Sequence, residues 1–252
     1  MAKHLFIIGA QRSGTTYLYK MLDAHPEVYM AKPVVPEPKY FINPENNSTD
    51  YNAYFKKYFT DAGDVVWLGE KSTSYMECDE AAIAISRLIP SAAIIVMLRD
   101  PVERTISHYS FTRDNGLEPY DIERAIHEES LRKDNWRTSA KTSVNPYAYT
   151  ERSKYAPYLE QWKNLFGKDR LIILVTEHFV GNQSAIAALY RRLGINPRFV
   201  PPGLTEKVNA GSPARTGCTL SEKFRSSLQE MFQPWNQILK KNYGLDISCW
   251  EK

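Results

Sequence analysis

Short runs of consecutive apolar residues alternate along this chain with longer segments in which apolar residues return every three to four positions. An unbroken apolar run is typical of a strand buried on both faces, and the longer period is typical of a helix with one buried face. Strands are predicted at residues 5–8, 65–68, 93–98 and 171–175. Helices are predicted at residues 15–24, 81–88, 155–166 and 184–193. This alternation predicts a three-layer α/β/α fold with a central parallel sheet.

Two segments do not follow the alternation. Residues 32–60 are rich in proline and aromatic residues and form a predicted excursion between the first helix and the second strand. Residues 200–218 have the composition of a loop, and we expect the helix that follows, 220–243, to be broken near Pro234. Long ordered loops are often binding lids, and disorder is the alternative. Because no repeat and no linker divides the chain, residues 1–252 are predicted to form a single domain.

Composition narrows the classes of function. The 252 residues are 43% hydrophobic and 24% charged, as is usual for globular proteins. The net charge of +3 is too small to indicate nucleic-acid binding, although it suits a small anionic ligand. Cys78, Cys218 and Cys249 are odd in number and lack the spacing of a zinc site, so neither a disulfide framework nor a structural metal is predicted.

No targeting or membrane segment is predicted. The apolar run before Gly9 is too short for the core of a signal peptide, and no stretch approaches the ~20 apolar residues of a membrane span. We therefore expect a cytoplasmic protein and leave open whether it forms a homo-oligomer.

The first motif with chemical content is GAQRSGTT, residues 9–16, which lies between the first predicted strand and the first predicted helix. Backbone N–H groups and the helix dipole favour an anion at such a place. The spacing G-x-x-x-x-G matches a phosphate-binding loop, but Thr15 stands where nucleotide kinases have a lysine. Arg12 inside the loop is the alternative cation, and the hydroxyl of Thr16 can add a donor.

The second motif is LRDPVERTISHY, residues 98–109. Arg99 ends the strongest predicted strand, at the edge where ligands of open α/β sheets bind, and Ser107 lies about two helical turns beyond it. An arginine and a serine can hold a phosphate from two directions. Asp100 and Pro101 predict a helix start, so a simple Arg99–Asp100 cap with a surface serine is the alternative.

With GEKSTSYM at residues 69–76 and RSKYAPYLEQWKNLFGKDRLIILVTEHF at residues 152–179, these motifs resemble a known family. It is the sulfotransferase family that uses 3′-phosphoadenosine 5′-phosphosulfate (PAPS), and more closely its carbohydrate-type and bacterial branch. The resemblance covers most of the chain, and LRDPVERTISHY is its most specific part. It implies a P-loop-like sulfotransferase fold and transfer of a sulfuryl group to a hydroxyl or amine of a small-molecule or carbohydrate acceptor.

The resemblance also implies which residues bind PAPS. The glycine loop would hold the 5′-phosphosulfate, with Arg12 where the family usually has lysine or arginine. Arg99 and Ser107 would hold the 3′-phosphate, which distinguishes PAPS from ATP. A basic-glycine segment in the late loop would close over the 3′-phosphate and the adenine. The complete predicted set is Gln11, Arg12, Ser13, Gly14, Thr15, Thr16, Arg99, Ser107, Arg215, Thr216 and Gly217.

Arg12 and two further residues are implied in the transfer itself, without a metal. Related sulfotransferases place a general base in a K-E-P type stretch, and PEPKYF supplies Glu37 in the matching place. Pro36 stands where that pattern has a basic residue, and Lys39 stands where histidine is frequent. Lys71 would stabilise the charge that develops on the sulfuryl group, or orient Glu37. The alternative for Glu37 is an exposed loop carboxylate, and the alternative for Lys71 is a surface lysine at the end of a strand.

Two other functions stay open at this point. One is a P-loop kinase of a nucleotide or small alcohol, against which Thr15 and the lack of a clear magnesium-binding carboxylate count. The other is a binding module that senses a nucleotide without turnover. It would need Arg99 and Ser107 but neither Glu37 nor Lys71. The aromatic residues in 40–59 could stack a sugar, a phenol or a flat natural product, or they could form a packed lid.

Overall fold

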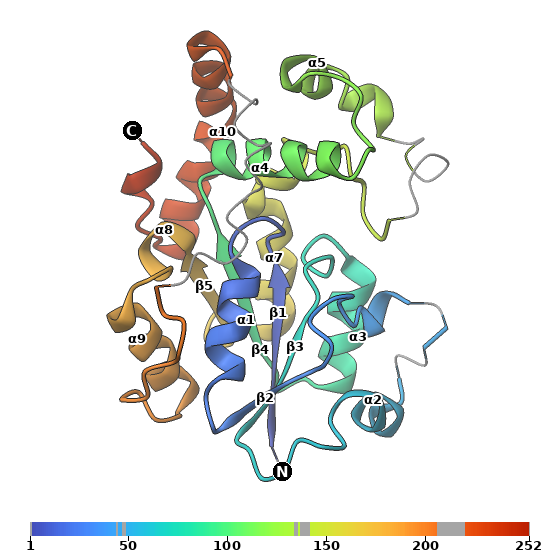
Figure 1. Ribbon diagram of the computed structural model, residues 1–252, viewed down its shortest axis with the longest axis vertical. Helices are drawn as coiled ribbons and strands as arrows, with labels where there is room; N and C mark the ends of the chain where they lie inside the picture. Colours follow the sequence, from blue (N-terminus) through green and yellow to red (C-terminus); the bar gives the residue numbers. More distant parts are fainter. Residues whose placement is uncertain are drawn as a thin grey trace. The chain divides into compact units, whose positions relative to one another are not determined.

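A computed structural model describes residues 2–43, 45–46, 49–133, 136, 142–205 and 220–251 (Figure 1). The chain divides into two compact units. The first contains the described residues up to Leu98 and those from Tyr158 to 205. The second contains Arg99–Pro157 and the described residues from Leu220 onward. That the whole chain forms one domain stays a prediction.

The first unit is built on a parallel sheet of five strands in the order β2-β3-β1-β4-β5. This confirms the central parallel sheet that the alternating pattern predicts. The strands are β1 Lys3–Gly9, β2 Val28–Met30, β3 Trp67–Lys71, β4 Ala93–Leu98 and β5 Leu171–Val175. Strands β4 and β5 begin and end at the predicted residues. Because all pairs are parallel, the carboxyl ends of the strands lie at one edge of the sheet.

Strands β2 and β3 differ from the prediction. The three residues of β2 are too few to give a periodic signal, and the strand was not predicted. Strand β3 starts later than the apolar run at 65–68 and continues through Glu70 and Lys71. Those two residues pair with Phe6 and Ile7 of β1, so the backbone ladder extends the strand although the side chains are charged.

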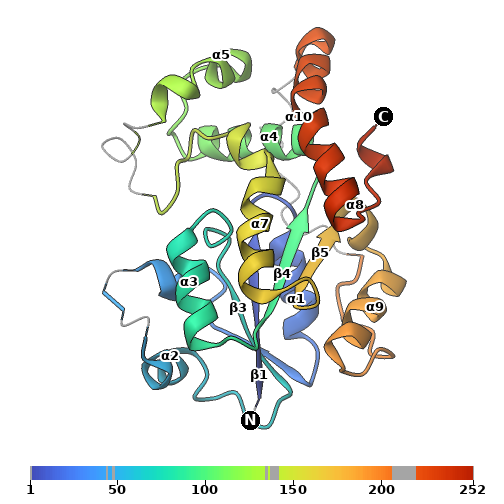
Figure 2. The same cartoon turned by 180° about the vertical axis from the view of Figure 1, so that it is seen from behind.

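Helices cover both faces of this sheet. Figures 1 and 2 show α1 and α9 on one face, and α3 with the later part of α7 on the other. The elements of the first unit are α1 Thr15–Asp23, η1 Tyr40–Ile42, α2 Tyr51–Tyr58, α3 Asp79–Leu88, α8 Thr176–Phe179 and α9 Gln183–Leu193. Helix α7, Tyr155–Phe166, begins in the second unit and belongs to the first from Tyr158. The four predicted helices of this part are confirmed to within two residues.

The excursion between α1 and β3 is packed by its aromatic rings. Tyr40, Phe41, Tyr54 and Phe59 are each at most 5% exposed. The Tyr54 ring stacks on Phe6 of β1 with a centroid separation of 6.3 Å. Of the two alternatives for this segment, packing therefore applies to these rings, which are too buried to stack a ligand.

The second unit is helical over its described residues. Its elements are α4 Pro101–Asp114, α5 Ile122–His127, η2 Ser130–Arg132, η3 Glu151–Ser153, α10 Glu222–Tyr243, η5 Ser248–Trp250 and the first turn of α7. Helix α4 begins as predicted. The Asp100 carboxylate accepts hydrogen bonds from the backbone N–H groups of Val102 and Glu103, at 2.8 and 3.1 Å, and Pro101 occupies the first turn.

Helix α10 corrects the prediction of a break near Pro234, since it is continuous through that residue. Leu228 and Phe232 before the proline, and Leu239 after it, are at most 1% exposed. Burial of this stripe on both sides offsets the backbone hydrogen bond that proline removes. Neither α10 nor another helix of the described residues combines the length and the apolar character needed to cross a membrane.

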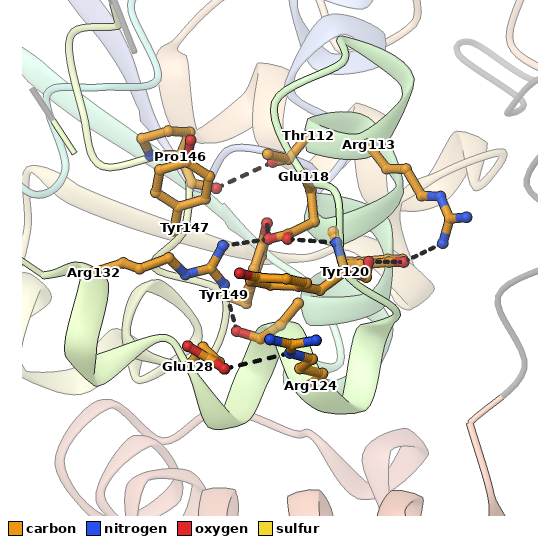
Figure 3. Close-up of polar contacts among 12 residues, drawn as sticks. Thr112, Arg113, Glu118, Tyr120, Arg124, Glu128, Arg132, Pro146, Tyr147 and Tyr149 are labelled. Atoms are coloured by element: carbon orange, nitrogen blue, oxygen red, sulfur yellow. Dashed lines mark hydrogen bonds and ion pairs between the residues drawn. The ribbon is translucent and has the colours of Figure 1, made fainter. Parts of the chain in front are cut away.

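A buried carboxylate just after the C-terminal end of α4 bonds side chains from two later segments of the second unit (Figure 3). Glu118 accepts hydrogen bonds from the Tyr149 hydroxyl at 2.6 Å and from Arg132 at 2.7 Å. Burial, followed by the Glu118 carboxylate, raises the pKa of Tyr149. The Tyr149 carbonyl oxygen in turn accepts from the side chains of Arg104 and Thr105 on α4, at 3.0 and 3.2 Å. These contacts fix the orientation of α4 within the second unit.

Acid should weaken the first unit through His4. This residue of β1 is 4% exposed and lies among the rings of Phe6, Tyr51, Tyr54 and Phe59. Burial lowers the pKa of His4 to about 4. Because the pKa of an unfolded histidine is about 6.5, the unfolded chain binds a proton in this interval that the folded chain does not. The free energy of unfolding therefore falls as the pH falls from 6.5 towards 4.

We expect this decrease between pH 7 and pH 4 to be about 3 kcal/mol larger in the wild type than in His4→Phe. Urea unfolding at a series of pH values measures it, with the exposed His178→Phe as the control for loss of a histidine. Parallel curves for the wild type and His4→Phe would contradict the expectation.

Candidate functional site

The glycine loop follows β1 at the carboxyl edge of the sheet. The backbone N–H of Ala10 bonds the Met97 carbonyl oxygen of β4 at 2.8 Å, which ties the start of the loop to the neighbouring strand. Arg12 and Gly14 have positive φ angles of 73° and 82°. Left-handed backbone turns of this kind direct N–H groups into a common concavity that favours anions, and a non-glycine residue holds one only at a cost of about 1–3 kcal/mol.

The start of α1 is arranged to receive an anion. Gly14 is the N-cap and has no side chain that could cap the first turn, which begins with Thr15. The first N–H groups of a helix have no partner within the helix. The Ser13 hydroxyl is buried, and no group in the described part of the chain bonds it. A phosphate or sulfate oxygen would satisfy both the hydroxyl and the helix N–H groups. The loop therefore fits a 5′-phosphosulfate.

Thr176, which the motif analysis did not single out, supports this loop. It is the first residue after β5, and its hydroxyl lies 2.7 Å from the Ser13 carbonyl oxygen and 2.8 Å from that of Leu98. The hydroxyl thus joins the loop after β1 to the last residue of β4. Thr176 lies in the segment 152–179 that carries the family resemblance, but a hydroxyl directly after a predicted strand is too common to be distinctive by itself.

Glu37 and Lys71 are brought together at the carboxyl end of β3. The Lys71 ammonium bonds Glu37 Oε1 at 2.5 Å, and the side chains are only 4% and 15% exposed. Thr73 adds its backbone N–H, which bonds Glu37 Oε2 at 2.8 Å, and its hydroxyl at 3.0 Å. Neither residue is therefore the exposed surface charge of the alternative interpretation. The role of Thr73 was not predicted. It depends on tertiary contact between Glu37 and side chains that follow it by 34 and 36 positions in the chain.

The second unit contains the other predicted phosphate ligands. The Arg99 guanidinium is 3.7 Å from the Glu103 carboxylate and its side chain is 31% exposed. Glu103 also accepts from Arg225 of α10 at 2.8 Å. Ser107 is half-buried on α4, one turn beyond Glu103. His108, on the same helix, is 2% exposed and packs edge-on against the Tyr149 ring.

Two predictions about ligands need separate mention. Arg215, Thr216 and Gly217 lie outside the described residues, so their role stays a prediction. Among the residues that the structure describes, no group of three or more histidine, cysteine, aspartate or glutamate side chains is arranged to hold a metal ion.

Comparison with known proteins identifies relatives for most of the chain. A model described as the sulfotransferase family matches residues 4–48 and 42–198. The mouse bifunctional heparan sulfate N-deacetylase/N-sulfotransferase 4 is 26% identical over 203 residues, which cover 77% of this chain and 22% of that protein. The Dictyostelium discoideum membrane-associated sulfotransferase kil1 is 31% identical over 133 residues, which cover 50% and 28%. The chain thus spans less than a third of the length of these two relatives.

A third relative is matched over more of its length. The mouse heparan sulfate glucosamine 3-O-sulfotransferase 5 is 22% identical over 262 aligned positions, which cover 92% of this chain and 69% of that protein.

Solved structures share the fold. A sulfotransferase from Alicyclobacillus acidocaldarius superimposes with a TM-score of 0.79 at 22% identity, covering all of both chains. The mouse sulfotransferase SULT7A1 complexed with PAP superimposes with a TM-score of 0.57 at 12% identity, covering 99% of this chain and 88% of that one. The parallel sheet, the glycine loop after β1 and the family match over residues 4–198 agree, and the chain belongs to the sulfotransferase family.

Proposed function

We propose that this protein transfers a sulfuryl group from PAPS to a hydroxyl or amine of a small-molecule or carbohydrate acceptor. The observation that carries the proposal is the Lys71–Glu37 ion pair at the end of β3. It joins a candidate base and a candidate cation from separate segments at the edge of the sheet that also carries the anion-binding loop. A module that only senses a nucleotide would need no such pair, and the family assignment leaves the kinase alternative without support.

PAPS would be held through its two charged ends. The loop residues Gln11–Thr16 would bind the 5′-phosphosulfate, and the buried Ser13 hydroxyl supports this because it has no partner in the described part of the chain. Arg99 and Ser107 would bind the 3′-phosphate. Glu103 would orient the Arg99 guanidinium beforehand, and Asp100 fixes the first turn of the helix that carries Ser107. Arg215–Gly217 complete the proposed set.

In the proposed reaction the acceptor proton passes to the Glu37 carboxylate while the acceptor oxygen or nitrogen forms a bond to sulfur. The bond between sulfur and the 5′-phosphate oxygen breaks, and that oxygen keeps the bonding electrons as PAP leaves. Arg12 and the loop N–H groups would stabilise the charge on the leaving phosphate, and Lys71 would stabilise the sulfuryl oxygens. A carboxylate has about four lone-pair sites, so Glu37 can hold Lys71 and Thr73 and still accept a proton.

The names of the relatives and the packing of the excursion bear on the proposed acceptor. Relatives named as heparan sulfate sulfotransferases support a carbohydrate acceptor. The burial of Tyr40, Phe41, Tyr54 and Phe59 removes these rings as a stacking platform. Three points stay predictions from the sequence: a cytoplasmic location, the absence of a metal requirement and the absence of nucleic-acid partners. Whether the protein forms a homo-oligomer stays open.

The donor is tested by thermal stabilisation. PAP at 100 times its dissociation constant should add about 2.7 kcal/mol to the free energy of unfolding, whereas ATP with magnesium should add far less because it lacks the 3′-phosphate. Differential scanning fluorimetry with the two nucleotides at equal concentration measures this. An equal response to both would overturn the assignment of PAPS as the donor.

The base is tested by Glu37→Gln, which keeps the shape and a carbonyl oxygen for Lys71 but cannot take a proton. Turnover should fall by about 10²–10⁴-fold, with the PAP-induced shift in Tm unchanged. Transfer from labelled PAPS to a panel of 4-nitrophenol, an aliphatic alcohol and glucosamine provides the assay. The matched control is Glu45→Gln, an exposed carboxylate of the same excursion. Wild-type turnover in Glu37→Gln would refute the role of Glu37 as the base.

The loop is tested through Thr176→Val, which keeps the branched shape but removes the hydroxyl shared by the Ser13 and Leu98 carbonyl oxygens. Loss of one buried hydrogen bond costs about 1 kcal/mol, so we expect PAP to bind about fivefold more weakly. Isothermal titration calorimetry measures the Kd. Thr60→Val serves as the control, since its hydroxyl bonds only the Lys56 carbonyl oxygen at the end of α2. Equal Kd values for the wild type and Thr176→Val would contradict the expectation.

A further inference from the structure

A second carboxylate, Glu70, lies beside the proposed catalytic pair. It precedes Lys71 on β3 and is completely buried. The hydroxyls of Tyr54 and Ser72 donate hydrogen bonds to its two oxygens, each at 2.7 Å, and the Tyr75 hydroxyl also bonds it. Removing a carboxylate from water is costly unless its oxygens are satisfied, and three hydroxyl donors achieve that here.

Two of these hydroxyls also hold the segment that follows Glu37. The backbone N–H of Lys39 donates to the Ser72 hydroxyl oxygen at 2.8 Å. The backbone N–H of Phe41 donates to the Tyr75 hydroxyl oxygen at 3.0 Å. Glu70 is therefore connected, through one hydroxyl each, to two backbone groups within four residues of the proposed base.

The backbone N–H groups of Lys39 and Phe41 set the direction of both connections, because an N–H can only donate and the hydroxyls must accept from it. A hydroxyl has one hydrogen to donate, and an ionised carboxylate can only accept. The hydrogens of the Ser72 and Tyr75 hydroxyls must therefore point at Glu70, which leaves their lone pairs for the backbone N–H groups. A neutral amide in place of the carboxylate would present N–H groups to at least one of the three hydroxyls of Tyr54, Ser72 and Tyr75 and disturb the arrangement.

The backbone of the segment shows why it needs such support. Lys39 has a φ angle of 48°, a left-handed conformation that a non-glycine residue adopts only when its surroundings enforce it. Burial is the largest influence on the pKa of Glu70 and raises it, and the hydrogen bonds from Tyr75, Ser72 and Tyr54 offset part of this effect.

We propose that Glu70 is a positioning residue for the base, holding residues 37–41 through Ser72 and Tyr75 so that Glu37 keeps its place beside Lys71. The inference rests on the proposed function, because it assumes that Glu37 takes the proton. Glu70 does not touch the reacting atoms in this account. It acts through the segment that carries Glu37.

Tyr54 offers the matched control. Its hydroxyl donates to the same carboxylate at the same distance, but it comes from α2, and among the described residues this hydroxyl accepts no hydrogen bond from the backbone of Lys39 or Phe41. If Glu70 matters only for folding, Tyr54→Phe and Ser72→Ala should have equivalent effects. If Glu70 positions the base, Ser72→Ala should affect amide exchange and kcat more than Tyr54→Phe does.

Amide hydrogen exchange followed by NMR tests the connections without any assay of activity. We expect exchange to quicken about fivefold or more at Lys39 in Ser72→Ala, and at Lys39 or Phe41 in Glu70→Gln, because these amides lose an ordered acceptor. Tyr54→Phe should leave both amides near their wild-type rates. Unchanged exchange at both amides in Ser72→Ala and Glu70→Gln would overturn the inference.

Kinetics test the consequence for catalysis with the best acceptor of the panel and labelled PAPS. We expect kcat to fall about tenfold or more in Glu70→Gln and Ser72→Ala, with the KM for PAPS and the PAP-induced shift in Tm close to wild type. Tyr54→Phe should keep its kcat within about twofold even if its Tm falls. In the Glu37→Gln background, Glu70→Gln should cause little further loss, since two residues acting on one step are not additive.

The failures are distinguishable. If the wild type transfers no sulfuryl group to any acceptor, the proposed function is overturned and this inference with it. If the wild type is active but Glu70→Gln and Ser72→Ala keep their kcat, only the inference is overturned. The inference is also overturned if kcat falls as much in Tyr54→Phe as in Ser72→Ala. The loss would then reflect a less stable fold and not the position of Glu37.

Discussion

Parallel pairing of β1 with β3 and β4 is the constraint on which the rest of the first unit depends. In a parallel ladder every strand ends at the same edge, so segments distant in sequence deliver their next residues to one place. The glycine loop follows β1, Lys71 ends β3, and Thr176 follows β5. An antiparallel partner at any of these positions would move its side chains to the opposite edge. The placement of the glycine loop and of Lys71 at one edge is therefore a product of topology before it is a product of residue choice.

The same edge concentrates buried charge, and this has an energetic consequence. Glu37, Lys71 and Glu70 are largely or wholly removed from water. Buried ions of this kind seldom add net stability relative to well-packed apolar residues, although removing one partner is strongly destabilising. Every charge here is met by an opposite charge or by hydroxyl and N–H donors. Such an arrangement is expected where geometry is selected at the expense of stability, as at a catalytic site.

The parts of the molecule that could be predicted from the sequence are those with a local cause. Strands β4 and β5 are unbroken apolar runs, and α4 begins where Asp100 caps it. The loop was predicted from its spacing and Glu37 and Lys71 from the family resemblance, and the structure brings the last two into contact. What could not be predicted depends on tertiary pairing. The extension of β3 through two charged residues comes from its ladder with β1, and the continuity of α10 through Pro234 comes from buried contacts on both sides.

Thr176 and Ser72 show the same limit at finer scale, because a single hydroxyl carries no recognisable pattern. The Thr176 hydroxyl meets the Ser13 and Leu98 carbonyl oxygens, and the chain passes from Leu98 directly into Arg99. A short covalent and hydrogen-bonded path therefore leads from the loop to the residue proposed to hold the 3′-phosphate. Because both acceptors of the Thr176 hydroxyl are backbone carbonyl oxygens, it fixes the loop against the end of β4 through the backbone rather than through other side chains.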